Sequence, residues 1–82
     1  MNAPKAMNEL AAFMDRMTEA RREIAIAKLV EFGRQVDHIA AELPEQWHGR
    51  AIDALLEMAL ANGLVRAHGQ ELIEQILAAG FK

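Results

Sequence analysis

The sequence contains no cysteine, serine or tyrosine, and Thr18 is its only threonine. Without cysteine, the chain cannot form disulfide bridges, thiolate zinc sites or iron–sulfur clusters. Thr18 is the only side-chain hydroxyl and lies in no nucleophile motif. The five glycines match neither GxGxxG nor the Walker A phosphate loop. These absences predict a binding protein rather than an enzyme, with no cofactor, no metal ion and no small-molecule substrate.

The chain also has few positively charged residues. It contains nine Lys and Arg residues and twelve Asp and Glu residues, which gives a net charge of −3. Proteins that bind nucleic acid usually gain affinity from cations that replace phosphate counterions, so nucleic acid is a disfavoured partner. The longest uncharged run, residues 58–65, is much shorter than the roughly 20 residues of a membrane span. The first residues lack a continuous apolar signal segment. We therefore expect a cytoplasmic protein with no membrane partner.

The residues that are present favour a single helical domain over residues 1–82. Ala, Leu, Glu, Met and Arg are good helix formers, and no β-branched run alternates with a period of two. Pro44 should end one helix, and Asn62 with Gly63 should end another. The predicted fold is all-α, a small bundle of about four helices with one long central helix and a C-terminal helical hairpin. The helices are expected at about residues 4–17, 19–42, 50–61 and 69–79.

Two apolar stripes of helical spacing determine the first two predicted helices. The first contains Met7, Leu10, Met14 and Met17, with Ala6 and Phe13 beside it. Its heptad register breaks between Thr18 and Arg22, where Thr18 is predicted to be an N-cap. A continuous helix with a shifted apolar face is the alternative, because this segment has neither Gly nor Pro. The second stripe is predicted to be a core or dimer seam and contains Leu29, Phe32, Val36, Ile39 and Leu43.

The two C-terminal helices are predicted to end in the same way. Gly63 should be a left-handed C-cap with Leu64 packing back, and Gly80 with Phe81 should repeat that closure. Each helix has an apolar face that should point inward. These faces contain Ile52, Leu55, Leu56, Ala59 and Leu60 in the first, and Leu72, Ile73, Ile76 and Leu77 in the second.

The length of the second helix suggests a homodimer. At 1.5 Å per residue a helix over residues 19–42 is about 36 Å long, whereas a compact 82-residue domain is about 30 Å across. Its seam therefore needs a partner, which is either the first helix folded back or the same helix of a second copy.

Three clusters are candidate binding surfaces for a protein partner. Met14 and Met17 could form an adaptable apolar groove, but core packing is the favoured interpretation. Arg21 and Arg22, near Arg16 and Lys28, form a basic corner or an ordinary solvated face. Trp47 and Arg50 could form a binding loop, or Trp47 could close the end of the core.

The histidines provide weak grounds for a metal site. His38 and Glu42 are four residues apart, and Glu45 and His48 have the E-x-x-H spacing of di-iron bundles. Those bundles need two such pairs and this chain has one, so a surface pair between His38 and Glu42 is the simpler interpretation. His68 is expected in the linker before the last helix.

The sequence as a whole favours a small non-enzymatic interaction module that acts as a regulator, adaptor or inhibitor of a protein partner, in the manner of small phage- or plasmid-encoded proteins. The alternative is a small DNA-binding regulator that uses the basic corner or a degenerate helix-turn-helix centred on Gly63. In that motif His68, Gln70, Glu71, Glu74 and Gln75 would face DNA, and this set carries almost no positive charge.

Overall fold

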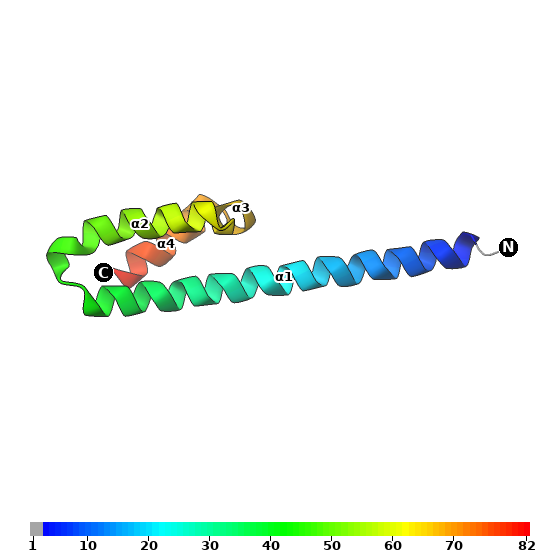
Figure 1. Cartoon of the computed structure of the whole chain (residues 1–82), viewed down its shortest axis with the longest axis horizontal. Coiled ribbons are helices and arrows are strands. Elements are labelled where there is room, and N and C mark those ends of the chain that lie inside the picture. Colours follow the sequence, from blue (N-terminus) through cyan, green and yellow to red (C-terminus); the bar gives the residue numbers. More distant parts are fainter. Residues whose placement is uncertain (1–2) are drawn as a thin grey trace.

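A single helix of 40 residues, α1 (Ala3–Glu42), runs along most of the length of the molecule (Figure 1). The computed structural model describes residues 3–82, with side chains from residue 5 onward. At 1.5 Å per residue α1 is about 60 Å long, which accounts for most of the 69 Å long dimension of the molecule. The all-α prediction is confirmed, because helices and no strands are found over residues 3–82.

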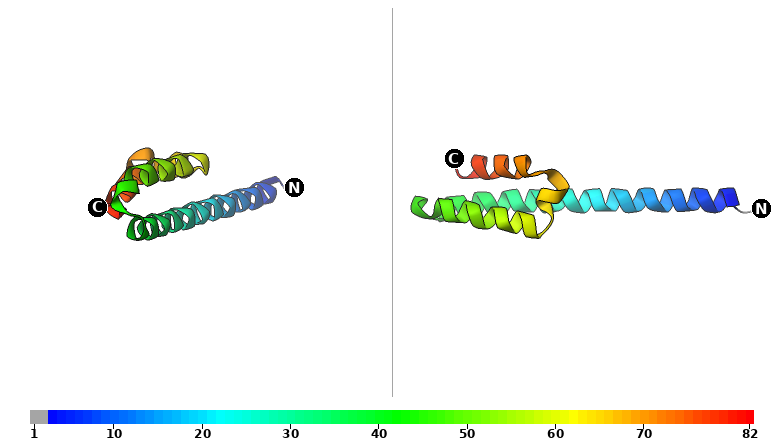
Figure 2. Two further views of the ribbon diagram at one scale, coloured as in Figure 1. Left: turned by 60° about the vertical axis from the view of Figure 1, so that its left-hand side comes forward. Right: turned by 90° about the horizontal axis from the view of Figure 1, so that it is seen from above.

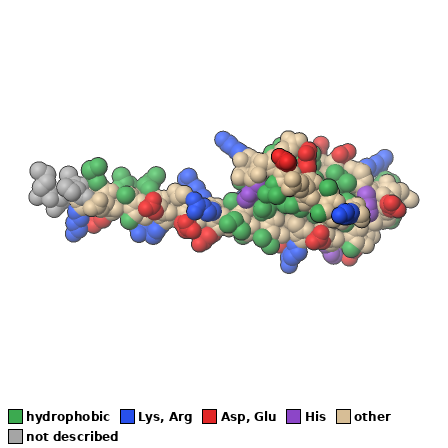
Figure 3. Space-filling view, turned by 180° about the vertical axis from the view of Figure 1, so that it is seen from behind, with side chains coloured by type: hydrophobic (Ala, Val, Ile, Leu, Met, Phe, Trp, Pro, Cys, Tyr) green, Lys and Arg blue, Asp and Glu red, His purple; other side chains and the backbone are tan. Residues whose placement is uncertain are grey.

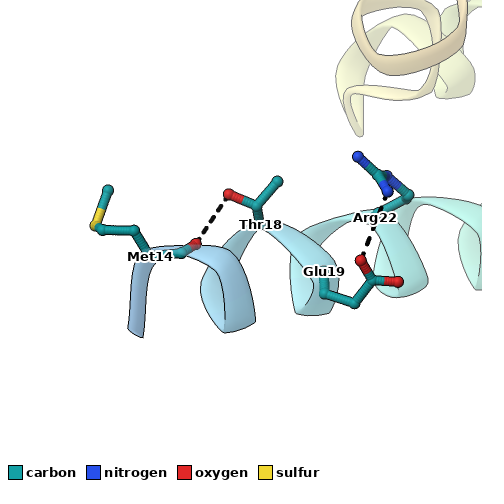
Figure 4. Close-up of polar contacts among 4 residues, drawn as sticks. All are labelled: Met14, Thr18, Glu19 and Arg22. Carbon is teal, nitrogen blue, oxygen red and sulfur yellow. Dashed lines mark hydrogen bonds and ion pairs between the residues drawn. The ribbon is translucent and has the colours of Figure 1, made fainter. Parts of the chain in front are cut away.

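The predicted break at Thr18 is wrong, and the alternative of one continuous helix is confirmed. The Thr18 hydroxyl donates a hydrogen bond to the carbonyl of Met14, one turn back in the same helix, at 3.0 Å (Figure 4). A threonine in a helix interior often satisfies its hydroxyl in this way, and the main-chain hydrogen bonds continue past it. The change of apolar register near this residue therefore does not interrupt the helix.

The rest of the chain folds back against the C-terminal half of α1. The turn after α1 contains a short 3₁₀ helix, η1 (Glu45–Trp47), and is followed by α2 (His48–Ala61), α3 (Leu64–His68) and α4 (Gln70–Gly80). Both α2 and α4 run beside α1, and α3 forms the bend between them (Figures 1 and 2). The N-terminal half of α1 extends beyond this bundle.

The core joins all four α-helices, and the predicted seam lies inside it. Phe32 and Val36 of α1 are buried, while Leu29 and Ile39 pack against them and Leu43 is half-buried. The seam is therefore covered by α2–α4 of the same chain and not by a folded-back N-terminal segment. The other buried residues are Leu55, Ala59, Leu64, Ile73 and Leu77.

Two residues that were predicted to face inward are exposed. Leu60 is 55% exposed, and Leu72 is also exposed. Both lie at the edge of their predicted apolar stripes. The bundle needs only the narrower face centred on Leu55 and Ala59 in α2 and on Ile73 and Leu77 in α4.

Gly63 and Gly80, the two glycines predicted to end helices in the left-handed conformation, have different structural roles. Gly63 has φ +83° and Leu64 is buried, as predicted for a left-handed C-cap. Gly80 remains helical as the last residue of α4, so the predicted second left-handed closure is wrong. A methyl group at Gly80 would overlap the side chain of Val36. Glycine at this position therefore allows the end of α4 to approach α1 closely.

Candidate interaction surface

The N-terminal half of α1 is an exposed arm that projects from the bundle (Figure 3). Every residue from Lys5 to Ile24 is exposed, and Ala25 is the first half-buried residue of α1. We call residues 5–24 the arm. Its 20 residues extend about 30 Å at 1.5 Å per residue.

One side of the arm carries large apolar side chains. Met7 is 70% exposed, and Leu10, Phe13 and Ile24 are each more than half exposed. Isolated apolar residues on a surface are common, but a contiguous row of them usually marks a binding surface. The arm stripe, as we name it, consists of Met7, Leu10, Phe13, Met14, Met17 and Ile24.

The molecule has a larger accessible surface than a compact protein of the same mass. Its accessible surface is 6437 Å², whereas a compact 9.1 kDa protein exposes about 4,900 Å². The surplus of about 1,500 Å² reflects the extended shape, to which the arm is the main contributor.

The structure answers the question of whether Met14 and Met17 belong to the core. They are 55% and 41% exposed, so the interpretation of this face as core is wrong. The sequence prediction did not include Ile24 in this surface, because the register counted from Met7 was ended at Arg21, a charged residue at an expected apolar position. Counted from Leu10, the positions 10, 13, 17, 20 and 24 are all apolar, and this pattern was the available signal.

The arm joins the bundle at a small notch. Arg21, Ile24 and Lys28 of α1 face the turn between α2 and α3, and the enclosed volume is about 190 Å³. Its lining is mostly apolar and includes two cations, Arg21 and Lys28. On the α2–α3 side the notch is lined by Asn62, Gly63, Leu64 and Ala67.

The residues of the predicted basic corner point in different directions. Arg21 lines the notch, whereas Arg22 lies 3.5 Å from Glu19 in an exposed ion pair (Figure 4). Such pairs contribute about 0–1 kcal/mol. Arg22 therefore behaves as part of a solvated face, and Arg21 with Lys28 is the pair of cations that shares a site.

Trp47 and Arg50 lie at the other end of the bundle. The guanidinium carbon of Arg50 lies 5.0 Å from the centre of the Trp47 ring, within the range of a cation–π contact. Trp47 is 42% exposed, so it does not close the end of the core. His48 has that role, because its ring packs edge-on against Phe81 at 5.0 Å and its Nε2–H donates to the carbonyl of Leu43 at 3.0 Å.

The other histidines make polar contacts of two kinds. His68, the last residue of α3, donates from Nε2 to the carbonyl of Ala25 at 3.0 Å and fastens α3 to α1 where the arm begins. His38 and Glu42 form an exposed pair with 3.6 Å between Nε2 and Oε1. Over the residues that the structure describes, no three potential ligands converge on a metal position.

In the helix-turn-helix considered for the DNA-binding alternative, the second helix is interrupted. After the turn at Gly63, α3 has only five residues, and Gly69 with φ +89° separates it from α4. The residues expected to face DNA are therefore divided between the end of α3 and the start of α4.

No helix within the described part of the chain has the length and apolar character to span a membrane. Comparisons with protein-family models, with curated proteins and with solved structures find no match to this chain.

Proposed function

We propose that this protein is a non-enzymatic interaction module, acting as a regulator, adaptor or inhibitor, whose arm stripe binds a helix of another polypeptide. The observation that carries the proposal is the exposure of the arm stripe. It places large apolar side chains in water along a rigid helix, where they contribute nothing to the core of the bundle.

The shape of this surface favours a helical partner. Its apolar residues recur at three- and four-residue intervals along one face, which is the pattern that a second helix can pack against with knobs in holes. Four of its six members are methionine or phenylalanine, namely Met7, Phe13, Met14 and Met17. Such side chains are common on protein-binding surfaces because they are large and, in methionine, flexible.

The bundle provides a second, separate surface at Trp47 and Arg50. These residues flank the end of α1 opposite to the arm, so an adaptor would have two contact points at opposite ends of one molecule. Tryptophan and arginine are frequent at binding hot spots.

Site-specific photo-crosslinking in the source cells tests the proposal. A photoreactive phenylalanine analogue at Phe13 should form a discrete adduct with a polypeptide, and the adduct should disappear when Leu10→Glu is added. The matched control is the same analogue at Glu74, an exposed position on α4, which should give no such adduct. Equal labelling at both positions, or none at Phe13, would refute an arm that binds protein.

The DNA-binding alternative has its own signature. It predicts that the protein is retained on DNA in a salt-sensitive manner and that Arg21→Glu/Arg22→Glu lowers this retention. Such a result, together with an absence of adducts at Phe13, would favour the alternative over the proposed function.

A further inference from the structure

We propose that the arm stripe binds the arm of a second copy of this chain in antiparallel orientation, with Glu9 of each copy opposite Arg16 of the other. This inference rests on the proposed function of the arm as a helix-binding surface and names its occupant. It depends on the register of the stripe, on the charges beside it and on the length of the arm.

The arm has an unbroken coiled-coil seam. Residues 6, 10, 13, 17, 20 and 24 alternate four and three apart, which is the spacing of the a and d positions of a heptad, and all are apolar. The seam members are Ala6, Leu10, Phe13, Met17, Ala20 and Ile24.

Two flanks of different character border this seam. One flank is charged and carries Glu9, Arg16 and Glu23, at the g positions of the heptads. The other flank, at the e positions, carries Met7 and Met14 and then Arg21. Neither Glu9 nor Arg16 has an ion-pair partner among the side chains that the structure describes, so both are available to another chain.

Charge disfavours a parallel pair in register. In that arrangement each g residue lies near the e residue five positions later in the other copy. Glu9 would meet Met14, and Arg16 would meet Arg21, which gives two repulsive contacts per dimer.

In an antiparallel pair, the charged flanks of the two copies face each other, and so do the flanks that carry Met7 and Met14. In one register, opposite charges then pair with each other. When Leu10 of each copy lies opposite Phe13 of the other, Glu9 lies opposite Arg16 twice. Met7 then lies opposite Met14 twice on the other flank. Met17 packs against Ala6, so every large apolar side chain from residue 7 to residue 17 meets an apolar partner.

The neighbouring antiparallel register is much poorer. A shift of one heptad toward the bundle places Arg16 opposite Arg16 and Glu9 opposite Glu23. The charges therefore select one antiparallel register over the next.

The length of the arm fits the same register. If Leu10 lies opposite Phe13, residue 3 of one copy lies level with residue 20 of the other, just before the notch lined by Arg21 and Ile24. The described parts of the two helices therefore overlap over residues 3–20 of each copy, and the overlap stops short of the notch.

Charge-reversal variants of the full-length protein test the orientation by sedimentation velocity, from low micromolar to several hundred micromolar. The wild type should form dimers. Glu9→Arg alone and Arg16→Glu alone should each weaken dimerisation about tenfold, because two attractive contacts become repulsive. An equimolar mixture of these two variants should recover it, since every Arg then meets a Glu. The control Asp15→Arg, on the outward face, should change little.

Disulfide trapping gives an independent readout, because the chain has no cysteine of its own. Mixed Glu9→Cys and Arg16→Cys chains should oxidise to the heterodisulfide faster than either variant forms its own. At a concentration where the wild type is monomeric, circular dichroism should show the same thermal transition of the bundle for all variants, since residues 9, 15 and 16 are exposed.

The outcomes separate this inference from the proposed function. A wild type that stays monomeric throughout, or a tighter dimer for Arg16→Glu, overturns the antiparallel pairing. If the purified protein is monomeric while Phe13 crosslinks to a different protein in cells, the proposed function survives and the second copy is excluded as the occupant.

Discussion

Gly80→Ala tests the close packing of α4 against α1. The added methyl group would overlap Cγ1 of Val36, a stiff β-branched side chain that is fully buried. Overpacking of this kind costs about 1–3 kcal/mol, and the better helix propensity of alanine offsets about 0.5–1 kcal/mol. We therefore expect Gly80→Ala to lower the free energy of unfolding by up to about 2.5 kcal/mol, with about 1 kcal/mol as the central value.

The chain contains a matched control for this substitution. Gly33 lies in the middle of α1, and a methyl group there would meet nothing within 4 Å. Gly33→Ala should therefore raise the free energy of unfolding by about 0.5–1 kcal/mol. A second variant, Gly80→Ala/Val36→Ala, should lose less stability than the two single changes added together, because the new methyl group enters the space that Val36 vacates.

Urea unfolding followed by circular dichroism measures the wild type and the four variants, including Val36→Ala alone, which the comparison with the double variant requires. One protein concentration must be used throughout, because self-association would add to the apparent stability. A domain of this size has a stability of about 4–12 kcal/mol, so a change of about 1 kcal/mol is readily resolved, and it corresponds to a fall in Tm of about 4–8 °C per kcal/mol. If Gly80→Ala stabilises the protein as Gly33→Ala does, α4 does not pack on Val36 as described.

The other predictions concern the turn, the core, the arm and the basic corner. Gly63→Val should lower the free energy of unfolding by about 1–3 kcal/mol, because a β-branched residue is strained at φ +83°; an unchanged urea midpoint would contradict this. Phe32→Ala should cost about 3–5 kcal/mol in the same assay, because the ring is buried between α1 and the other helices. Leu10→Glu should leave the unfolding of the bundle unchanged and remove self-association in sedimentation experiments, so a stability loss as large as that of Phe32→Ala would place Leu10 in the core. Arg21→Ala/Arg22→Ala should change stability by less than about 0.5 kcal/mol, and a loss of crosslinking at Phe13 would identify the notch as part of the binding surface.

Local signals in the sequence were sufficient to predict much of the bundle. The spacing of Phe32 and Val36, the stop at Pro44 and the left-handed turn at Gly63 each depend on chemistry within a few residues. The structure bears out all three. The all-α class follows from the same helix-forming composition.

Features that depend on distant contacts were harder to predict. Nothing near Gly80 in the sequence shows that Val36 approaches it, so its resemblance to Gly63 suggested a second turn. Trp47 and His48 are adjacent, and only the position of Phe81 determines which of them packs at the end of the bundle.

The arm was difficult for a different reason. An apolar stripe of helical spacing predicts a buried face equally well whether the partner belongs to the same chain or to another. The change of face near Thr18 was interpreted as a break between helices. The helix instead continues through Thr18, and the exposed arm extends six residues further, to Ile24.

Hydrogen exchange shows whether the arm is a binding surface that another polypeptide completes. A helix with no tertiary partner opens readily, so its amides should be weakly protected. For the purified protein, we expect the amides of residues 5–20 to gain protection as the protein concentration rises. The amides of α2 and α4 should be protected equally at every concentration, and the arm of Leu10→Glu should stay unprotected. If the arm is equally protected at every concentration, and equally in Leu10→Glu, then no second polypeptide is needed to cover it.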